Sequence, residues 1–359
     1  MTDEVELKLV VNQQFADFLA REISNFRVLK QETIFLGNCY YDTHEGYFSR
    51  RKMGLRVRRQ DEHFTLTLKT GGCVTGGLHI RPEYNIELNS ETPDLSGLKQ
   101  FPELDITTDL ALSPVFSTDF TRCMWLVECA NGAEIEIALD QGEIRATGRS
   151  EPIDEVEFEL KQGKLSDLLT FVGGLSLNDG IRLSSVSKAQ RGYQLIAGKR
   201  WQLTDWISKW RELSALEKTA AGESAVEKTQ EILTALFNLE QQLIEETIMV
   251  GIDDYFAADF LRTVERISAF FNLYHYYSEN SRFFETTLKN EQAESVQDIL
   301  IELTESHIYL FEQIRDIIRL HSENKDNRLA MSKLMELLHQ AQYVKRMLNL
   351  IRLTVKQNG

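Results

Sequence analysis

The chain has 359 residues, of which 42% are hydrophobic and 26% charged, so it can bury a sizeable core and is not disordered throughout. Its formal net charge of −15 argues against nonspecific binding of duplex nucleic acid through a basic surface. The sequence has no run of 18 apolar residues, and residues 1–11 alternate charged with apolar side chains. We therefore expect no nucleic-acid partner, no membrane span and no secretion signal.

The cysteine content points to a reducing compartment. The four cysteines show no Cys-x-x-Cys spacing and no nearby histidine pairing; they are Cys39, Cys73, Cys123 and Cys129. This pattern is typical of free thiols rather than of a disulfide framework or a zinc site. We therefore expect a cytoplasmic protein.

The first half of the chain alternates apolar and polar residues, the pattern of half-buried strands. It predicts eight strands, at 5–11, 34–42, 55–59, 64–69, 83–88, 116–128, 133–138 and 153–161. Asn131-Gly132 predicts a hairpin because both residues tolerate positive φ, and Gln141-Gly142 indicates a second, weaker turn. Helical spacing interrupts the strands at 13–26, after a capping Asn12, and at 164–172. The strands are close enough in sequence to be mainly antiparallel.

From about residue 200 the apolar period changes to that of helices and does not change back. Long apolar stripes predict helices at 223–250, 255–279, 294–321 and 329–355, and no proline follows residue 200. These helices indicate a bundle. With the joint at Ala197-Gly198-Lys199, the sequence predicts two domains, residues 1–198 and residues 199–359.

Several strands carry their charges on one face only. On the first strand, Glu4, Glu6 and Lys8 occupy alternate positions and so share a face. The same alternation places the following polar residues on one face of their strands: Arg56 and Arg58; Thr65, Thr67 and Lys69; Arg81, Glu83, Asn85 and Glu87; Glu134, Glu136 and Asp140; and Glu155, Glu157 and Glu159. On any single strand, a solvated outer face explains such a pattern. Rows of same-face carboxylates repel one another, however, and glutamate is depleted in strands. A closed barrel with its charges inside resolves this conflict when cations bridge the carboxylates.

Such an interior has a defined chemistry. Arginine and lysine side chains aimed at one axis suit a phosphate-sized anion, because guanidinium groups match phosphate oxygens. Clusters of glutamate oxygens favour hard cations such as Mg²⁺ or Mn²⁺ over zinc. A divalent cation, carboxylates and basic residues around a polyphosphate are the components of phosphoryl hydrolysis.

The order of these residues resembles the CYTH, or triphosphate tunnel metalloenzyme, superfamily. Glu4-Val5-Glu6-Leu7-Lys8 resembles the N-terminal signature of this superfamily. Further motifs follow in the family's order at Arg56-Val57-Arg58, Lys69, Arg81-Pro82-Glu83, Arg122, Glu134-Ile135-Glu136, 155–159 and Ser187-Lys188-Ala189. Residues 76–84 and 135–142 are most similar to the bacterial inorganic triphosphatases. The resemblance covers 1–196 and implies an α+β fold, in which an eight-stranded antiparallel β tunnel, a closed barrel with flanking helices, precedes an all-α bundle.

The resemblance also implies roles for particular residues. The metal ligands would be Glu4, Glu6, Glu136, Glu157 and Glu159, with Asp140 and Glu155 as further candidates. The phosphates would be held by Lys8, Arg56, Arg58, Lys69, Arg81, Arg122 and Lys188, with Arg191 as an addition. The catalytic set would be Glu4, Glu6, Lys8 and Glu157, acting with Mg²⁺ or Mn²⁺ on a water molecule. Because no side-chain nucleophile is required, His44, His63 and His79 are expected in turns or at the surface.

The second half resembles a CHAD helical domain, which is associated with polyphosphate binding. Residues 258–266 look like a degraded version of its first helix, because the early histidine of that helix is missing. The bundle is therefore expected to be a scaffold or an interaction surface.

The leading hypothesis is hydrolysis of inorganic triphosphate to pyrophosphate and orthophosphate. A nucleoside or thiamine triphosphatase, or an adenylyl cyclase of the same fold, is an alternative that needs a pocket for the base. A noncatalytic polyphosphate-binding module is another. The sequence leaves open the choice of metal, the role of the bundle and the oligomeric state.

Overall fold

The computed structural model describes the chain except for residues 1–2, 199–203, 220–224, 252–258, 280–293 and 356–359. The described residues divide into two compact units. One contains 3–176 and 183–198, and the other contains 177–182 and the described part of 204–355. Lys199, part of the predicted joint, and residues 223–224 and 255–258, the predicted starts of two helices, lie outside the described residues.

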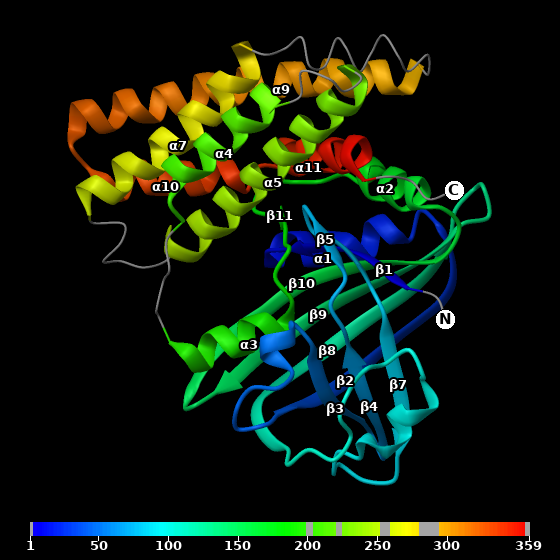
Figure 1. The fold of residues 1–359 in the computed structure, drawn as a ribbon. Coiled ribbons are helices and arrows are strands. Elements are labelled where there is room, and N and C mark those ends of the chain that lie inside the picture. Colours follow the sequence, from blue (N-terminus) through cyan, green and yellow to red (C-terminus); the bar gives the residue numbers. More distant parts are fainter. Residues whose placement is uncertain (1–2, 199–203, 220–224, 252–258, 280–293, 356–359) are drawn as a thin grey trace. The chain divides into compact units, whose positions relative to one another are not determined.

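The first unit is built on one curled antiparallel sheet (Figure 1). Its strands are β1 (Glu4–Val10), β2 (Arg27–Asp42), β3 (Gly54–Gln60), β4 (His63–Lys69), β5 (Cys73–Thr75), β6 (Leu78–Arg81), β7 (Glu83–Leu88), β8 (Ser113–Glu128), β9 (Glu134–Ala146), β10 (Arg149–Gln162) and β11 (Arg182–Leu183). The spatial order is β5-β6-β1-β10-β9-β8-β2-β3-β4-β7, with β11 paired to β1. The fold is thus mixed α+β.

The sheet has eleven strands in place of the predicted eight. The three additions, β5, β6 and β11, have two to four residues each, too few to show an alternating pattern. The turn predicted at Gln141-Gly142 is wrong, because both residues lie inside β9 and pair with β8 and β10. Glycine is required there by a close approach of strands: a Cβ on Gly142 would lie 2.1 Å from the carbonyl oxygen of Asp119.

The apolar face of the long strands is covered by helices α1 (Gln13–Ile23) and α2 (Leu165–Gly174). Asn12 caps α1 by accepting a hydrogen bond from the amide of Phe15 at 2.8 Å, as the sequence predicts. On β10, Phe158 is fully buried and its ring lies 6.3 Å from that of Phe171 in α2. Since neighbouring residues of a strand point to opposite faces, Glu157 and Glu159 face away from the helices.

A third helix, α3 (Lys188–Ala197), packs against the sheet beside β8. Its cap Ser187 accepts a hydrogen bond from the amide of Gln190. A Cβ on Gly192 would lie 2.2 Å from the ring of Phe116, so the helix lies directly on this ring. The hydroxyl of Tyr193 also donates to Asp42, at 3.1 Å. These contacts fix Lys188 at the start of the helix.

Connecting segments of the first unit include two short 3-10 helices, η1 (Ser49–Arg51) and η2 (Leu95–Gln100). Leu95 and Leu98 of η2 are buried in a core cluster with Leu66 and Leu68 of β4. The loop before η1 is organised by buried Asp42, whose carboxylate accepts hydrogen bonds from the amides of Phe48 and Ser49. Both segments therefore belong to the packed structure of the sheet unit.

The second unit is helical in its described part. It contains α4 (Trp206–Thr219), α5 (Ala225–Gly251), α7 (Phe260–Glu279), α9 (Glu294–Asn324), α10 (Asn327–Leu338) and α11 (Ala341–Thr354). The predicted helix 329–355 is wrong in one respect, because it breaks between α10 and α11. Residues of the 177–182 segment satisfy the backbone at the break: the amide of Gly180 donates to His339, and Asp179 accepts from the amide of Ala341. No described helix is long and apolar enough to cross a membrane.

Candidate active site

The central part of the sheet face that carries the charges is buried. Glu6 is 2% exposed and Lys8 1% exposed, although a solvated strand face would leave both in water. The strand register places Lys8 opposite Glu157, Glu155 opposite Asp140, and Asp140 opposite Arg122. Acidic and basic residues from four strands therefore meet on one side of the curled sheet.

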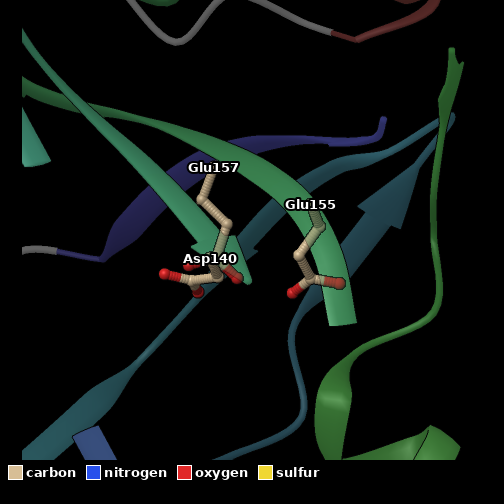
Figure 2. Close-up of side chains that lie close together, drawn as sticks. All are labelled: Asp140, Glu155 and Glu157. Atoms are coloured by element: carbon tan, nitrogen blue, oxygen red, sulfur yellow. The ribbon is translucent and has the colours of Figure 1, made fainter. Parts of the chain in front are cut away.

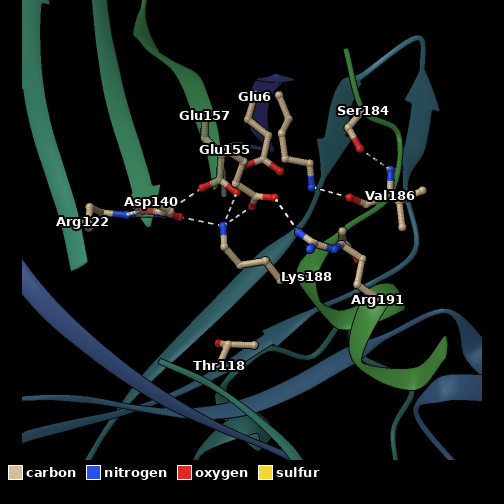
Figure 3. A network of polar contacts seen from close by, with 12 residues as sticks. Glu6, Thr118, Arg122, Asp140, Glu155, Glu157, Ser184, Val186, Lys188 and Arg191 are labelled. Atoms are coloured by element: carbon tan, nitrogen blue, oxygen red, sulfur yellow. Dashed lines mark hydrogen bonds and ion pairs between the residues drawn. The ribbon is translucent and has the colours of Figure 1, made fainter. Parts of the chain in front are cut away.

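Three carboxylates form the densest cluster on this face (Figure 2). Asp140 of β9 and Glu155 and Glu157 of β10 each offer an oxygen within 4.8 Å of the others, and Asp140 and Glu155 are buried. Arg122 forks onto Asp140 with two contacts of 2.7 Å and reaches Glu157 at 2.8 Å. Lys188 contacts all three carboxylates (Figure 3). Burial raises the pKa of Glu157, but Lys188 and Arg122 outweigh it and hold this pKa well below its usual range.

A second cluster surrounds Glu4 and Glu6 of β1. The ammonium of Lys69 lies 2.6 Å from Glu4 and 2.7 Å from Glu83, and the guanidinium of Arg81 lies 2.6 Å from Glu6. Burial raises the pKa of Glu4 to about 7 against the attraction of Lys69. The charges of the neighbouring carboxylates Glu6 and Glu83 also raise this pKa, so the effect of Lys69 does not offset burial.

Arg56 and Arg58 of β3 lack a carboxylate ion pair among the described residues, and so does Lys8 of β1. Arg58 donates from Nε to Asn38 at 2.9 Å, and within the described ranges neither arginine is ion-paired. Burial, together with Arg56 and Arg122, lowers the pKa of Arg58 to about 9. The buried Nε of Arg56 has no hydrogen-bond partner in the described structure. Glu83 attracts the charge of Arg56 and contributes to its raised pKa, so the unbalanced positive charge is greatest at Arg58, where it favours an anion.

The predicted metal ligands lie in three places rather than one. Glu157 belongs to the cluster with Asp140 and Glu155, whereas Glu4 and Glu6 contact Lys69 and Arg81. The remaining two, Glu136 and Glu159, are partly exposed and share the ammonium of Lys161. The sequence ranked Asp140 and Glu155 below these residues, although Glu155 has the parity of Glu157 and Asp140 has that of Glu136. The erroneous turn at Gln141-Gly142 ended the predicted strand short of Asp140.

The predicted phosphate ligands of the strands lie on the charged face, and Lys188 reaches this face from helix α3. Lys8 donates from Nζ to the carbonyl of Val186 at 2.6 Å, and its backbone accepts from the amide of Ser184. Lys8 thus ties β1 to the segment that leads into α3. Arg191, the additional candidate, reaches Glu151 at 2.6 Å and Glu155 at 3.4 Å.

The expectation for His79 is wrong. Its side chain is fully buried on β6, opposite Glu6 in the register, whereas His44 and His63 are exposed. Its Nε2 lies 3.2 Å from the carbonyl oxygen of Ser184, so Nε2–H donates in the neutral ring. Burial, together with the charge of Lys8, lowers the pKa of His79 to about 3. The sequence signal for this burial was its shared parity with Arg81.

Comparison with known proteins identifies the family of this chain. The family model described as the CYTH domain matches residues 2–193. Together with the close relative described next, this match shows that the chain belongs to the CYTH family.

The relative is the inorganic triphosphatase of Haemophilus influenzae, which is 45% identical over 358 residues. The alignment covers 99% of this chain and 98% of that protein, so it includes the helical half as well as the sheet.

Solved structures with similarity to this chain match about half of it. A Hippeastrum protein described as an adenylyl cyclase with a dominant triphosphatase activity shares 18% identity, with a TM-score of 0.40, and covers 54% of this chain and 97% of its own. An inorganic triphosphatase shares 17% identity, with a TM-score of 0.22, and covers 48% of this chain and 81% of its own.

Proposed function

We propose that this protein hydrolyses inorganic triphosphate to pyrophosphate and orthophosphate on the charged face of the sheet, with a divalent cation. The observation that carries the proposal is the separation of charge across this face. Partly buried arginines that have no carboxylate ion pair among the described residues lie on β3, and a cluster of three carboxylates lies on β9 and β10. An anion and a divalent cation together satisfy both sides. The activity named for the Haemophilus influenzae relative supports this choice of substrate.

We also propose that the sheet is a closed tunnel of eight main strands. β6 and β7 are separated only by Pro82, yet β6 pairs with β1 and β7 pairs with β4, near opposite ends of the strand order. Residues 78–88 thus connect the two edges as one interrupted strand. Proline is suited to the break because it cannot donate a ladder hydrogen bond. A tunnel encloses its substrate and limits access of water to the charges.

The basic residues of this face bind and orient the anion in the proposed mechanism. Arg56 and Arg58 take phosphate oxygens first, because no carboxylate competes for them in the described structure. The other proposed phosphate ligands, Lys8, Lys69, Arg81, Arg122 and Lys188, have protein partners that the anion must share or replace. The substrate therefore rearranges existing ion pairs as it binds.

The carboxylates fit a hard divalent cation, since every donor that they offer is an oxygen. Asp140, Glu155 and Glu157 have the required proximity, and we propose that Glu4, Glu6, Glu136 and Glu159 contribute as the family resemblance implies. When bound, Mg²⁺ or Mn²⁺ neutralises phosphate charge and promotes attack by water. We assign the catalytic positions to Glu4, Glu6, Lys8 and Glu157, with the carboxylates orienting the attacking water.

Orthophosphate release from tripolyphosphate tests the proposal. The purified full-length protein is assayed with tripolyphosphate, pyrophosphate, long-chain polyphosphate, ATP and thiamine triphosphate at equal concentration, with added Mg²⁺ or Mn²⁺ and with a chelator. We expect tripolyphosphate to be hydrolysed fastest and the chelator to stop the reaction. Faster formation of a cyclic product from ATP would instead establish a cyclase. Tight binding of tripolyphosphate without turnover would establish a binding module.

The organisation of the chain is part of the proposal. We infer that residues 1–198 form the catalytic tunnel domain and that 199–359 form a separate, CHAD-like helical domain. The helical content of the described part of the second unit supports this division. We also propose a cytoplasmic location, which is consistent with the four free thiols.

A further inference from the structure

A lysine occupies the centre of the carboxylate cluster that fits a metal ion. The ammonium of Lys188 lies 2.7 Å from Asp140 and 2.9 Å from Glu157, and it also contacts Glu155 (Figure 3). Lys188 is the first residue of α3 and is buried. The cluster therefore already contains a cation that belongs to the protein.

These contacts use the full donor capacity of the lysine. An ammonium group has three N–H donors, and Lys188 contacts three carboxylates. A phosphate oxygen can receive a hydrogen bond from Lys188 only when at least one carboxylate gives it up. The phosphate-binding role proposed for Lys188 thus requires a change of partners.

Electrostatics opposes a metal ion and the ammonium in the same cluster. A divalent cation bound by these carboxylates would lie within a few ångströms of Nζ, where like charges in a buried site repel strongly. Lys188 is also unfavourably placed on its own helix, because the N-terminus of α3 carries a partial positive charge. The carboxylates hold Lys188 in place, and their loss frees it to move.

We propose that Lys188 and the divalent cation exchange: the metal takes the carboxylates of Asp140, Glu155 and Glu157, and the released ammonium turns to the triphosphate. This inference rests on the proposed function, because it requires a divalent cation on this face. It makes Lys188 a placeholder that, together with Arg122 and Arg191, keeps the three carboxylates paired before metal arrives. Metal and substrate binding are then coupled through one side chain.

Binding of Mn²⁺ in the absence of any phosphate compound tests the exchange. Electron paramagnetic resonance measures free Mn²⁺ during titration of the full-length protein and of Lys188→Met, which keeps the length of the side chain but removes its charge. We expect Lys188→Met to bind Mn²⁺ roughly tenfold or more tightly, because it has no ammonium to displace. Equal or weaker binding by a folded variant would overturn the exchange.

Lys30→Met is the matched control for the change in net charge. Lys30 is exposed on β2 and pairs with Glu32 at 2.9 Å, away from the carboxylate cluster in the sequence and on a different strand. The affinity of the Lys30→Met variant for Mn²⁺ should equal that of the unmodified protein. A comparable gain in affinity would mean that long-range charge accounts for the effect, and the exchange would fail.

A measurement on the unmodified protein covers the case in which Lys188→Met does not fold. Trace acetic anhydride is applied with and without Mg²⁺, and mass spectrometry measures acetylation of Lys188 relative to Lys30. Release from three carboxylates should raise the acetylation of Lys188, and unchanged or lower acetylation would contradict the exchange.

The Mn²⁺ titration also separates the two proposals. If neither the unmodified protein nor the variant binds Mn²⁺, the proposed divalent site itself is overturned. If both proteins bind Mn²⁺ equally, the exchange is overturned and the divalent site is not.

Discussion

At the scale of single residues, the site differs from an ordinary surface by the cost of its buried charges. Glu6, Lys8, Asp140 and Glu155 are each at most 2% exposed, and an isolated buried charge costs several kcal/mol or shifts its pKa. Pairing offsets this cost at most positions. The pKa of Glu4 is raised and the pKa of Arg58 is lowered, which means that the charged form of each is poorly stabilised. A bound cation would stabilise charged Glu4, and a bound anion would stabilise charged Arg58.

The raised pKa of Glu4 predicts pH-dependent metal binding. Because this pKa is about 7, Glu4 is protonated below neutral pH and must lose its proton to bind a cation. We expect Mn²⁺ affinity to rise with pH through this value, by up to roughly tenfold per pH unit on the acid side. Titration of the protein with Mn²⁺ at one pH unit below the pKa of Glu4 and at one pH unit above it measures this change in affinity. Glu4→Gln should flatten the profile in this window, and a flat profile in the unmodified protein would contradict the prediction.

Arg58 is expected to bind substrate. Replacing Arg58 with alanine removes a charged donor that has no carboxylate partner among the described residues, which should cost about 1.5–3 kcal/mol, or roughly a 10- to 100-fold loss in kcat/KM for tripolyphosphate. Arg59→Ala is the matched control, because Arg59 is the next residue of β3, points to the opposite face of the sheet and is exposed. Similar losses in both variants would show that position on this face is irrelevant.

At the scale of elements, α3 is held by shape as well as by charge. The ring of Phe116 lies under Gly192 and is confined by Tyr40, at 4.4 Å between ring centroids, and by Tyr193, at 5.2 Å. A side chain at Gly192 therefore has no space without movement of the helix. The position of Lys188 depends on this close packing.

Gly192→Ala is expected to destabilise the sheet unit by about 1–3 kcal/mol through overpacking, despite the better helix propensity of alanine. Urea unfolding of the full-length protein measures the change. Gly174→Ala in α2 is the control, because a Cβ there meets no atom within 4 Å. A second substitution, Phe116→Leu, should recover part of the lost stability. An unchanged unfolding midpoint in Gly192→Ala would refute the packing argument.

At the scale of the whole molecule, both units contain buried ion pairs. The helical unit has a fully buried ion pair, in which Arg346 donates to Glu240 at 3.0 and 3.1 Å. Tyr343 also donates to Glu240 at 2.8 Å, and Arg346 donates to Ser306 at 2.7 Å. Removing one member leaves the other charged, buried and unpaired.

Glu240→Gln should therefore lower the free energy of unfolding of the helical unit by roughly 3–5 kcal/mol. Far-UV circular dichroism during urea unfolding measures the loss of helix. The double variant Glu240→Leu with Arg346→Met should regain part of the stability, because it removes both buried charges, although the hydroxyls of Tyr343 and Ser306 lose a partner. If 199–359 is a separate domain, as proposed, tripolyphosphate hydrolysis without denaturant should persist in Glu240→Gln. Loss of activity with retained helix content would contradict that division.

The sequence by itself determined the class of fold and the parity of the site. Alternation predicts the long strands, and the positions of Glu6, Lys8, Arg58 and Glu157 follow from a period of two. The change of period after residue 200 predicts the helical half. These features are local, so neighbouring residues suffice to specify them.

Tertiary structure decided which charges meet. Short strands such as β5 and β11 exist only because β6 and β1 pair with them, and the break before α11 is satisfied by the distant residues Asp179 and Gly180. The grouping of Asp140 with Glu155 depends on the β9–β10 register, and Lys188 reaches them from a helix that follows in the chain. Such contacts join residues far apart in sequence, and only the curvature and register of the folded sheet determine them.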